Sequence, residues 1–127
     1  MSEAQIFNKL DSIHIRDLSV RCIVGIRDWE RKKKQDVLIN LTLHANLAKA
    51  CASDLIEDTI DYKSLKDRII QLVENSKFQL IERLADAVAE TCLAEARVKQ
   101  VDVTVDKPGA LRFARSVAVE ITRAKGE

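Results

Sequence analysis

Four short stretches of the chain contain the residue types that could carry chemistry, and each also has a structural explanation. Glu30 ends a charged segment that begins at Gly25 and includes the chain's only tryptophan, and Tyr62 follows Asp61 just before a predicted helix. Taken alone, the first stretch fits an ordinary charged loop with an aromatic anchor. The second fits a helix cap made by Asp61, with Tyr62 packing beside it.

The other two stretches hold a carboxylate and an amine where the backbone would fix them. Glu82 falls in the first turn of a second predicted helix, where the helix dipole stabilises an anion without any ligand. A carboxylate fixed there can also accept the paired N–H groups of an amidine-like ring edge. Lys107 lies between a predicted strand and the turn marked by Pro108 and Gly109. Its amine would be held near one place, although solvated lysines at strand ends are common.

The spacing of apolar residues predicts the elements that must position these groups. Apolar and polar residues alternate in four stretches, as they do in strands that bury one face. These stretches are 13–22, 37–43, 101–105 and 117–121. In the first of them the alternation slips in phase between Ile15 and Leu18, which predicts a β-bulge.

Two stretches between the strand pairs have helical spacing instead. Apolar residues recur on one face over 65–73 and again over 81–92, which predicts two amphipathic helices separated by a break near Phe78. The segment 45–61 is expected to be irregular, with a helical turn. The polar residues 1–11 are expected to be flexible.

The element order β-β-α-α-β-β predicts one α+β domain over residues 1–127. Two antiparallel hairpins would form a four-stranded sheet, with both helices on one face and a polar second face. Only one proline and a few charges protect the two sheet edges. We therefore expect copies of the chain to pair edge to edge, so that several sheets close into a larger barrel.

Composition argues against several classes of function. The 127 residues are 46% hydrophobic and 32% charged, which is ordinary for one globular domain. With 21 basic and 20 acidic residues the net charge is +1, which gives no electrostatic reason to bind nucleic acid or an anionic membrane. The chain contains no apolar run as long as a membrane span and starts with polar residues unlike a signal peptide, so we expect a cytoplasmic protein.

The cysteines and histidines do not form a recognisable metal or disulfide pattern. Cys22, Cys51 and Cys92 are odd in number and widely spaced, without a CxxC motif, so we expect reduced, buried thiols. His14 and His44 are far apart and fall at strand positions. We therefore expect no metal site.

In this order, and within this frame of elements, the four stretches resemble the dihydroneopterin aldolase family. The resemblance extends from about Ile13 to Thr122. Its most specific parts are Phe-x-Leu-Ile-Glu-x-Leu-Ala at 78–85 and Lys-Pro-Gly-Ala at 107–110. The other matching stretches are 25–30, 35–43 and 60–62.

The resemblance implies the tunnelling fold, in which subunits assemble into a barrel-shaped ring and two rings can stack. It implies a homo-oligomer, a tetramer or an octamer, with active sites between neighbouring subunits. It also implies an enzyme of folate synthesis that cleaves a small-molecule pterin, 7,8-dihydroneopterin, to 6-hydroxymethyl-7,8-dihydropterin and glycolaldehyde. The substrate's N5=C6 imine takes up the electrons of the broken bond, so this retro-aldol step requires no metal, cofactor or Schiff base.

Roles for individual residues follow from the same resemblance. Lys107 matches the family's catalytic lysine, which would transfer a proton and polarise N5 through water. Tyr62 matches a tyrosine that would relay the proton to the enamine. Glu30 matches a second glutamate that would hold the substrate's hydroxyl groups or orient Lys107. The residues that would bind the pterin ring, Glu82 by its carboxylate and the others by their backbone, are Glu82, Ile81, Leu80 and Ile60.

Two alternatives remain at this level. The stretch 110–117 is more similar to the sister enzyme, dihydroneopterin triphosphate 2′-epimerase, and Arg112 could reach a substrate phosphate. The basic run 31–34 is either a solvated loop face or a phosphate attractor. The segments 28–30 and 107–109 favour the aldolase. The second alternative is a ring that binds pterins or purines without catalysis.

Overall fold

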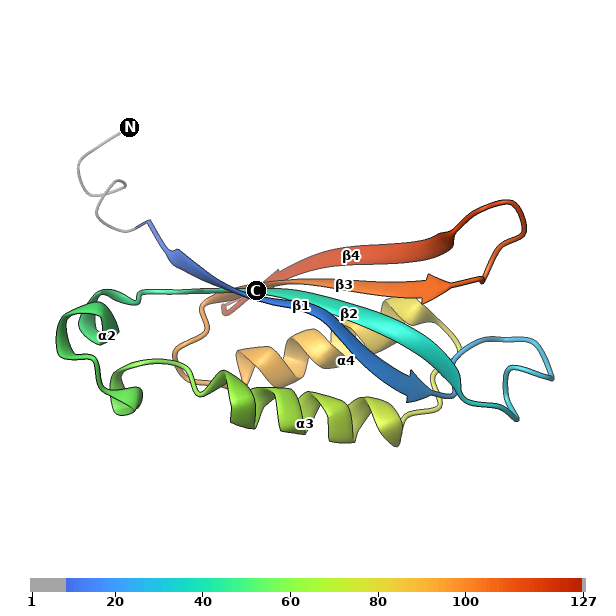
Figure 1. Ribbon diagram of the computed structural model, residues 1–127, viewed down its shortest axis with the longest axis horizontal. Coiled ribbons are helices and arrows are strands. Elements are labelled where there is room, and N and C mark those ends of the chain that lie inside the picture. The colour runs from blue at the N-terminus through green and yellow to red at the C-terminus, as the bar shows by residue number, and fades with distance from the viewer. Residues whose placement is uncertain (1–8, 127) are drawn as a thin grey trace.

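The computed structural model describes residues 9–126 of the 127-residue chain. Most of the segment expected to be flexible, residues 1–8, lies outside the described residues. The expectation is wrong for Asp11, which already begins the first strand. Figure 1 shows the order of the elements along the chain.

Four antiparallel strands form one sheet in the order β1-β2-β3-β4. The strands are β1 (Asp11–Cys22), β2 (Gln35–Ala45), β3 (Gln100–Pro108) and β4 (Ser116–Ala124). Each hairpin contributes one central and one edge strand, so β1 and β4 are the edges. The predicted α+β class and four-stranded sheet are confirmed.

The predicted slip in β1 is a β-bulge. The pairing with β2 shifts between Ile15 and Leu18, and Asp17 adopts a left-handed φ of 54°. The Asp17 backbone N–H donates to the Asn40 side chain at 2.9 Å, which satisfies a donor that the bulge removes from the ladder. The extra residue returns Leu18 and Val20 to the face that meets the helices.

Four helical segments connect the two hairpins. They are α2 (Ala48–Ser53), the 3₁₀ turn η1 (Ile56–Asp58), α3 (Tyr62–Glu74) and α4 (Ile81–Leu93). The predicted irregular segment with a helical turn is therefore confirmed. The helix expected from about Ser64 begins at Tyr62, because the Asp61 carboxylate caps it by accepting from the Ser64 N–H at 3.0 Å.

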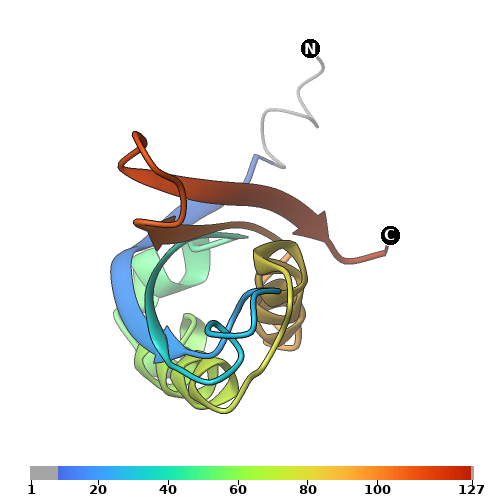
Figure 2. The same cartoon turned by 90° about the vertical axis from the view of Figure 1, so that its right-hand side faces the viewer.

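The core lies between one face of the sheet and the two long helices, and Figure 2 shows the sheet curving over them. The alternate apolar residues of β2 and β3 are buried, as are Leu65, Ile69 and Val73 of α3. The helix α4 buries a broader stripe that includes Leu84 and Val88. The hydrophobic spacing of the sequence thus corresponds to the buried faces.

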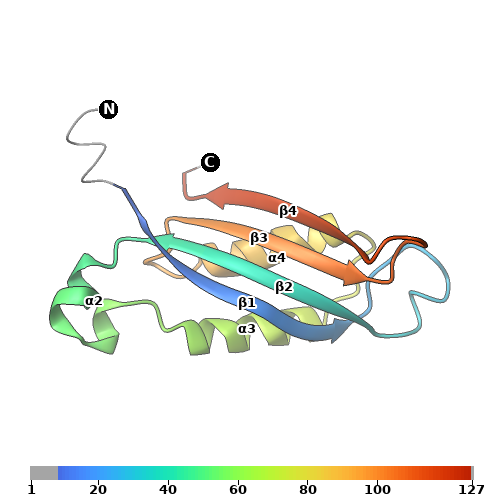
Figure 3. The same ribbon diagram turned by 45° about the horizontal axis from the view of Figure 1, so that its top comes forward.

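No helix among the described residues covers the other face of the sheet, which Figure 3 shows in front of α3 and α4. It carries a chain of polar contacts across the strands. The Asp102 carboxylate lies 2.7 Å from His44 Nε2 and accepts from the Thr122 hydroxyl at 2.7 Å. His14 lies 3.0 Å from the Thr42 hydroxyl. The prediction that both histidines occupy strand positions is confirmed.

The cysteines differ from expectation at one position. All three are free thiols, but only Cys22 and Cys92 are buried. The expectation of burial is wrong for Cys51, because it lies on the short helix α2, which has no buried residue among its six.

Candidate active site

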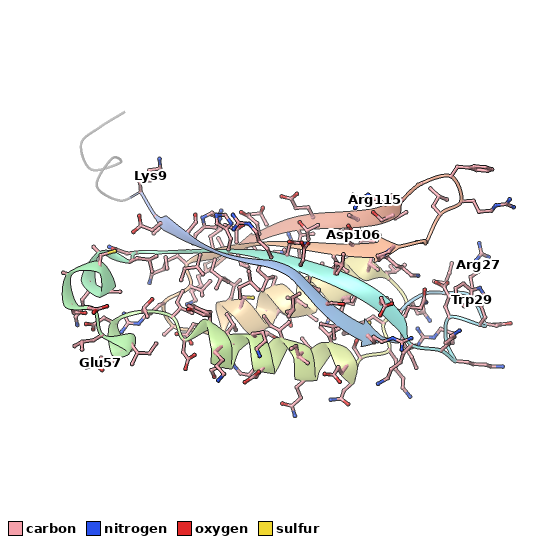
Figure 4. The ribbon with its side chains drawn as sticks, viewed as in Figure 1. Lys9, Arg27, Trp29, Glu57, Asp106 and Arg115 are labelled. Carbon is pink, nitrogen blue, oxygen red and sulfur yellow. The ribbon has the colours of Figure 1, made fainter. Side chains whose placement is uncertain are left out.

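Four connecting segments meet at one end of the molecule, which we call the pocket end. They are the loop between β1 and β2, the linker between α3 and α4, the first turn of α4, and the turn between β3 and β4 (Figure 1). Figure 4 labels Arg27 and Trp29 on the first of these segments, and Glu57 of η1 at the opposite end. Residues far apart in the sequence are thereby brought to one place.

A buried ion pair lies at the centre of the pocket end. The Lys107 ammonium donates to the Glu30 carboxylate, and the two residues are only 8% and 7% exposed. Lys107 is in phase with Val103 and Val105 on the buried face of β3, so its side chain points toward the helices. Burying an ammonium is costly unless an anion accompanies it, which Glu30 provides.

Further hydrogen bonds hold the Glu30 carboxylate in place. It accepts from the Arg27 backbone N–H at 3.1 Å and from the Gln35 side chain at 3.4 Å. Burial raises the pKa of the Glu30 carboxyl, but the hydrogen bonds from Lys107, Arg27 and Gln35 outweigh it, so the pKa lies below its usual value. Glu30 is therefore an anion at neutral pH.

Gly25 makes room for this carboxylate. Its φ is +136°, a conformation that side chains disfavour, and a Cβ there would lie 2.3–2.5 Å from the Glu30 carboxylate atoms. No other residue type fits while Glu30 keeps its position. Gly25 begins the stretch 25–30 that resembles the family, and the Glu30 carboxylate explains why a glycine is required at this position.

The ion pair borders an open pocket of about 200 Å³. The pocket's lining residues are Gly25, Ile26, Glu30, Gln79, Leu80, Ile81, Glu82, Lys107, Ala110 and Val117. Five predicted site residues therefore lie together, with the Glu82 carboxylate exposed at the start of α4. A larger hollow of about 560 Å³ along the end of α3 is lined by none of the predicted site residues.

Three predicted site residues are not among those that line this pocket. Tyr62, 58% exposed, belongs to the first turn of α3, at the end of the molecule opposite the pocket (Figure 1). Ile60 lies two residues before Tyr62 in the chain and is completely buried. Arg112 lies on the β3–β4 turn, two residues from Ala110, with its guanidinium 5.4 Å from the centre of the Phe113 ring.

Gln35 is a site residue that the sequence reasoning missed. Its side-chain amide donates to the Val24 carbonyl at 2.9 Å as well as to Glu30. Gln35 is in phase with Val37 and Ile39, so a polar residue at an apolar position was the signal that could have identified it.

The described residues contain no group of three or more histidine, cysteine or acidic side chains arranged to hold a metal ion. Within residues 9–126, none of the helices has the length and apolarity needed to cross a membrane. Chemically, the pocket offers an ammonium fixed by a carboxylate, next to a second, exposed carboxylate. This arrangement can transfer protons at one side of a ligand and accept N–H groups at the other.

Comparison with known proteins identifies the family. The family model described as dihydroneopterin aldolase matches residues 13–122. The dihydroneopterin triphosphate 2′-epimerase of Pseudomonas aeruginosa is 38% identical over 86% of this chain and 89% of its own length. The dihydroneopterin aldolase of Escherichia coli is 33% identical over 90% of this chain and 93% of its own length.

A solved structure supports the same assignment. The crystal structure of Escherichia coli dihydroneopterin aldolase in complex with neopterin superposes with a TM-score of 0.86 and 33% identity, covering 90% of this chain and 99% of that one. The predicted resemblance and the predicted enzyme class are confirmed. The chain belongs to the dihydroneopterin aldolase family, an enzyme family of folate synthesis.

Proposed function

We propose that this protein binds 7,8-dihydroneopterin in the pocket at the end of the sheet and cleaves it to 6-hydroxymethyl-7,8-dihydropterin and glycolaldehyde. The observation that carries the proposal is the buried Lys107–Glu30 pair, which opens on the same pocket as Glu82. The cytoplasmic location and the single domain over 1–127 expected from the sequence remain part of this proposal.

The pterin ring would bind on the side of the pocket made by the start of α4. The Glu82 carboxylate accepts the paired N–H groups of the ring in a charge-assisted, bidentate contact. None of the described side chains caps the start of α4 at Leu80, so the first backbone N–H groups of the helix are available to the ring's acceptors. Leu80 and Ile81 line the pocket on this side.

The substrate's side chain would then extend toward Lys107 and Glu30. Loss of the 2′-hydroxyl proton breaks the C1′–C2′ bond and releases glycolaldehyde, and the electron pair moves through C1′ and C6 to N5. The Lys107 ammonium, oriented by Glu30, polarises N5 through water and supplies its proton. Protonation at C1′ and return of the N5 proton to Lys107 restore the N5=C6 imine and complete the product, and we assign the relay of the C1′ proton to Tyr62.

A second copy of the chain would supply Tyr62, because the start of α3, which contains Tyr62, and the end of β3, which contains Lys107, lie at opposite ends of one chain (Figure 1). Both ends expose large apolar side chains that an oligomer would cover. At the pocket end these are Ile26, Trp29, Leu80, Leu111 and Phe113; at the other end they are Leu55, Ile56 and Tyr62. Together with the unpaired edges of β1 and β4, they favour a homo-oligomeric ring, a tetramer or an octamer, in which Tyr62 and the backbone at Ile60 approach a neighbour's pocket.

Product analysis tests this proposal. Incubation with 7,8-dihydroneopterin should release glycolaldehyde and 6-hydroxymethyl-7,8-dihydropterin in equal amounts, separated by chromatography. Borohydride added during turnover should trap no adduct on Lys107, because N5=C6 already provides the electron sink. Absence of both products, or a trapped adduct, contradicts the proposed reaction or its mechanism.

The 2′-epimerase is the second candidate function. It is favoured by Arg27 and Arg112, on two loops at the pocket end, where they could contact a substrate phosphate. Dihydroneopterin triphosphate should be tested in parallel with the unphosphorylated substrate, for the parent and for Arg112→Ala. If the triphosphate is the better substrate, the 2′-epimer dominates, and Arg112→Ala selectively weakens that reaction, the epimerase replaces the aldolase.

A further inference from the structure

Arg31 connects the two walls of the pocket. One wall is the β1–β2 loop with Gly25 and Glu30, and the other is the linker between α3 and α4. The Arg31 guanidinium donates from one nitrogen to the Gly25 carbonyl at 3.1 Å and the Phe78 carbonyl at 3.0 Å. Its other terminal nitrogen donates to the Lys77 carbonyl at 2.6 Å. We call these three hydrogen bonds the Arg31 bridge.

The backbone holds both ends of the bridge. The Gly25 N–H donates directly to the Phe78 carbonyl at 3.2 Å, so the two walls also touch through their main chains. The Arg31 N–H donates to the carbonyls of Arg27 and Asp28, at 3.1 and 3.2 Å, within the turn that contains Glu30. Arg31 therefore starts from a fixed turn and reaches a fixed linker.

Arginine suits this task better than lysine. Its guanidinium is planar and presents several N–H donors in a rigid fork, whereas a lysine ammonium is a flexible point charge. Because its donors are directed at three carbonyls, Arg31 is poorly placed to bind phosphate. This separates Arg31 from the rest of the basic run, residues 32–34, which is largely exposed.

We propose that Arg31 is a positioning residue that sets the distance between the Lys107–Glu30 pair and Glu82. Glu30 and Arg31 are neighbours in the sequence, and their side chains diverge, one toward Lys107 and the other toward the linker. The linker leads directly into α4, so its position determines where Glu82 lies. This inference rests on the proposed function, in which one ligand must contact Glu82 and Lys107 together.

The test compares Arg31→Met and Arg31→Lys with Arg21→Met. Arg21 is a matched control, because its guanidinium donates to the Lys34 carbonyl at 3.2 Å in the same loop and pairs with Asp36, without a hydrogen bond to the linker. For each variant, neopterin affinity, kcat and KM for dihydroneopterin, the pH profile and the oligomeric state are measured well below the thermal midpoint.

Arg31→Met should weaken neopterin binding and lower kcat together, by up to about 10²-fold in kcat, because the reacting groups lose their alignment. Arg31→Lys should recover only part of this loss, since a single ammonium nitrogen cannot reproduce the planar fork in which two guanidinium nitrogens bond the three carbonyls. The pH profile should keep its midpoints, because the Lys107–Glu30 pair is intact. Arg21→Met should behave like the parent.

Several results overturn the inference. Parent-like binding and turnover in Arg31→Met do so, as does an equal loss in Arg21→Met. If neither Arg31 variant can be isolated folded, the role is stability rather than positioning. If the parent itself neither binds neopterin nor turns over, the proposed function fails instead. Hydrogen exchange at the Gly25 amide then still tests the bridge, since it should be faster in Arg31→Lys and an unchanged rate contradicts the bridge.

Discussion

Both ends of the molecule expose large apolar side chains, but among the described residues only the pocket end holds an ion pair whose two partners are both buried. Glu30 and Lys107 form a closed pair with further bonds from Arg27 and Gln35. Tyr62 at the other end is more than half exposed. One end thus carries preorganised charged groups, and the other carries the exposed surface that a neighbouring copy would cover in the proposed ring.

The difference indicates how the proposed catalytic work divides between copies. Groups that must keep a fixed charge and position are held within one chain, where folding itself sets their geometry. A residue that acts only after bond cleavage can come from a neighbour.

The largest effect is expected at Lys107. Replacing Lys107 by Met removes the ammonium and should lower kcat by about 10²–10⁴-fold, the usual contribution of a general acid or base. Neopterin affinity should change far less, because Glu82 is untouched. Steady-state kinetics and direct neopterin titration separate the two quantities. A loss confined to affinity would remove Lys107 from the chemistry.

Gly25→Ala should have the next largest effect, and Gly109→Ala is its matched control. Both glycines have positive φ, so both replacements cost about 1 kcal/mol or more in backbone strain. Only at Gly25 would the new Cβ overlap the Glu30 carboxylate, since a Cβ at Gly109 would have no described atom within 4 Å beyond those of the adjacent residues in the chain. Gly25→Ala should therefore lose most of its activity, and Gly109→Ala should retain most of it. Equal activities would mean that the position of Glu30 is unimportant.

The Lys107–Glu30 pair should also make stability depend on pH. The pKa of Glu30 is lowered in the fold, so its stabilisation is present above the ordinary carboxyl range and is lost as pH falls through the folded pKa. Glu30→Gln leaves Lys107 buried without a counter-ion, at a cost of about 3–5 kcal/mol at neutral pH. The difference in the free energy of unfolding between the parent and Glu30→Gln should become smaller at acidic pH, where Glu30 is protonated in the parent. Urea unfolding at several pH values measures this difference. A difference that stays constant with pH would contradict the Lys107–Glu30 pairing.

The smallest effect concerns the thiols. Burial raises the pKa of the Cys92 thiol to about 12 and also raises that of Cys22, while Cys51 is exposed near the α2–η1 end. A thiol reagent at mildly alkaline pH should label Cys51 first and the other two only after unfolding. Mass spectrometry of the labelled peptides reports the order. Rapid labelling of Cys92 in the folded protein would indicate that α4 opens.

Local spacing predicted most of the fold. The alternation in 101–105 placed β3, and the phase slip between Ile15 and Leu18 placed the bulge. Both were predictable because burial alternates from one residue to the next along a strand, so apolar and polar residues alternate with it. Asp61 was predictable as a helix cap because the N–H group that it accepts from belongs to Ser64, only three positions away.

What the sequence could not predict depends on partners far along the chain. The carbonyls that Arg31 bonds in the linker lie 46 and 47 residues away and carry no side-chain signature. The need for Gly25 comes from the folded position of the Glu30 carboxylate. The exposure of Cys51 follows from the short helix α2 lying away from the core. The separation of Tyr62 from the pocket also appears only once α3 has a direction in space (Figure 1).

Mixing of two inactive variants tests most directly whether the site is completed between copies. Lys107→Ala removes the ammonium from the pocket of its own chain but keeps Tyr62, whereas Tyr62→Ala keeps the ammonium and removes the residue at the other end. Each variant alone should form little 6-hydroxymethyl-7,8-dihydropterin, because one lacks the ammonium and the other lacks the proton relay to C1′. After joint unfolding and refolding, the mixture should regain activity, because some interfaces combine an intact pocket with an intact Tyr62. A mixture no more active than its separate components, or full activity in Tyr62→Ala alone, would contradict the shared site.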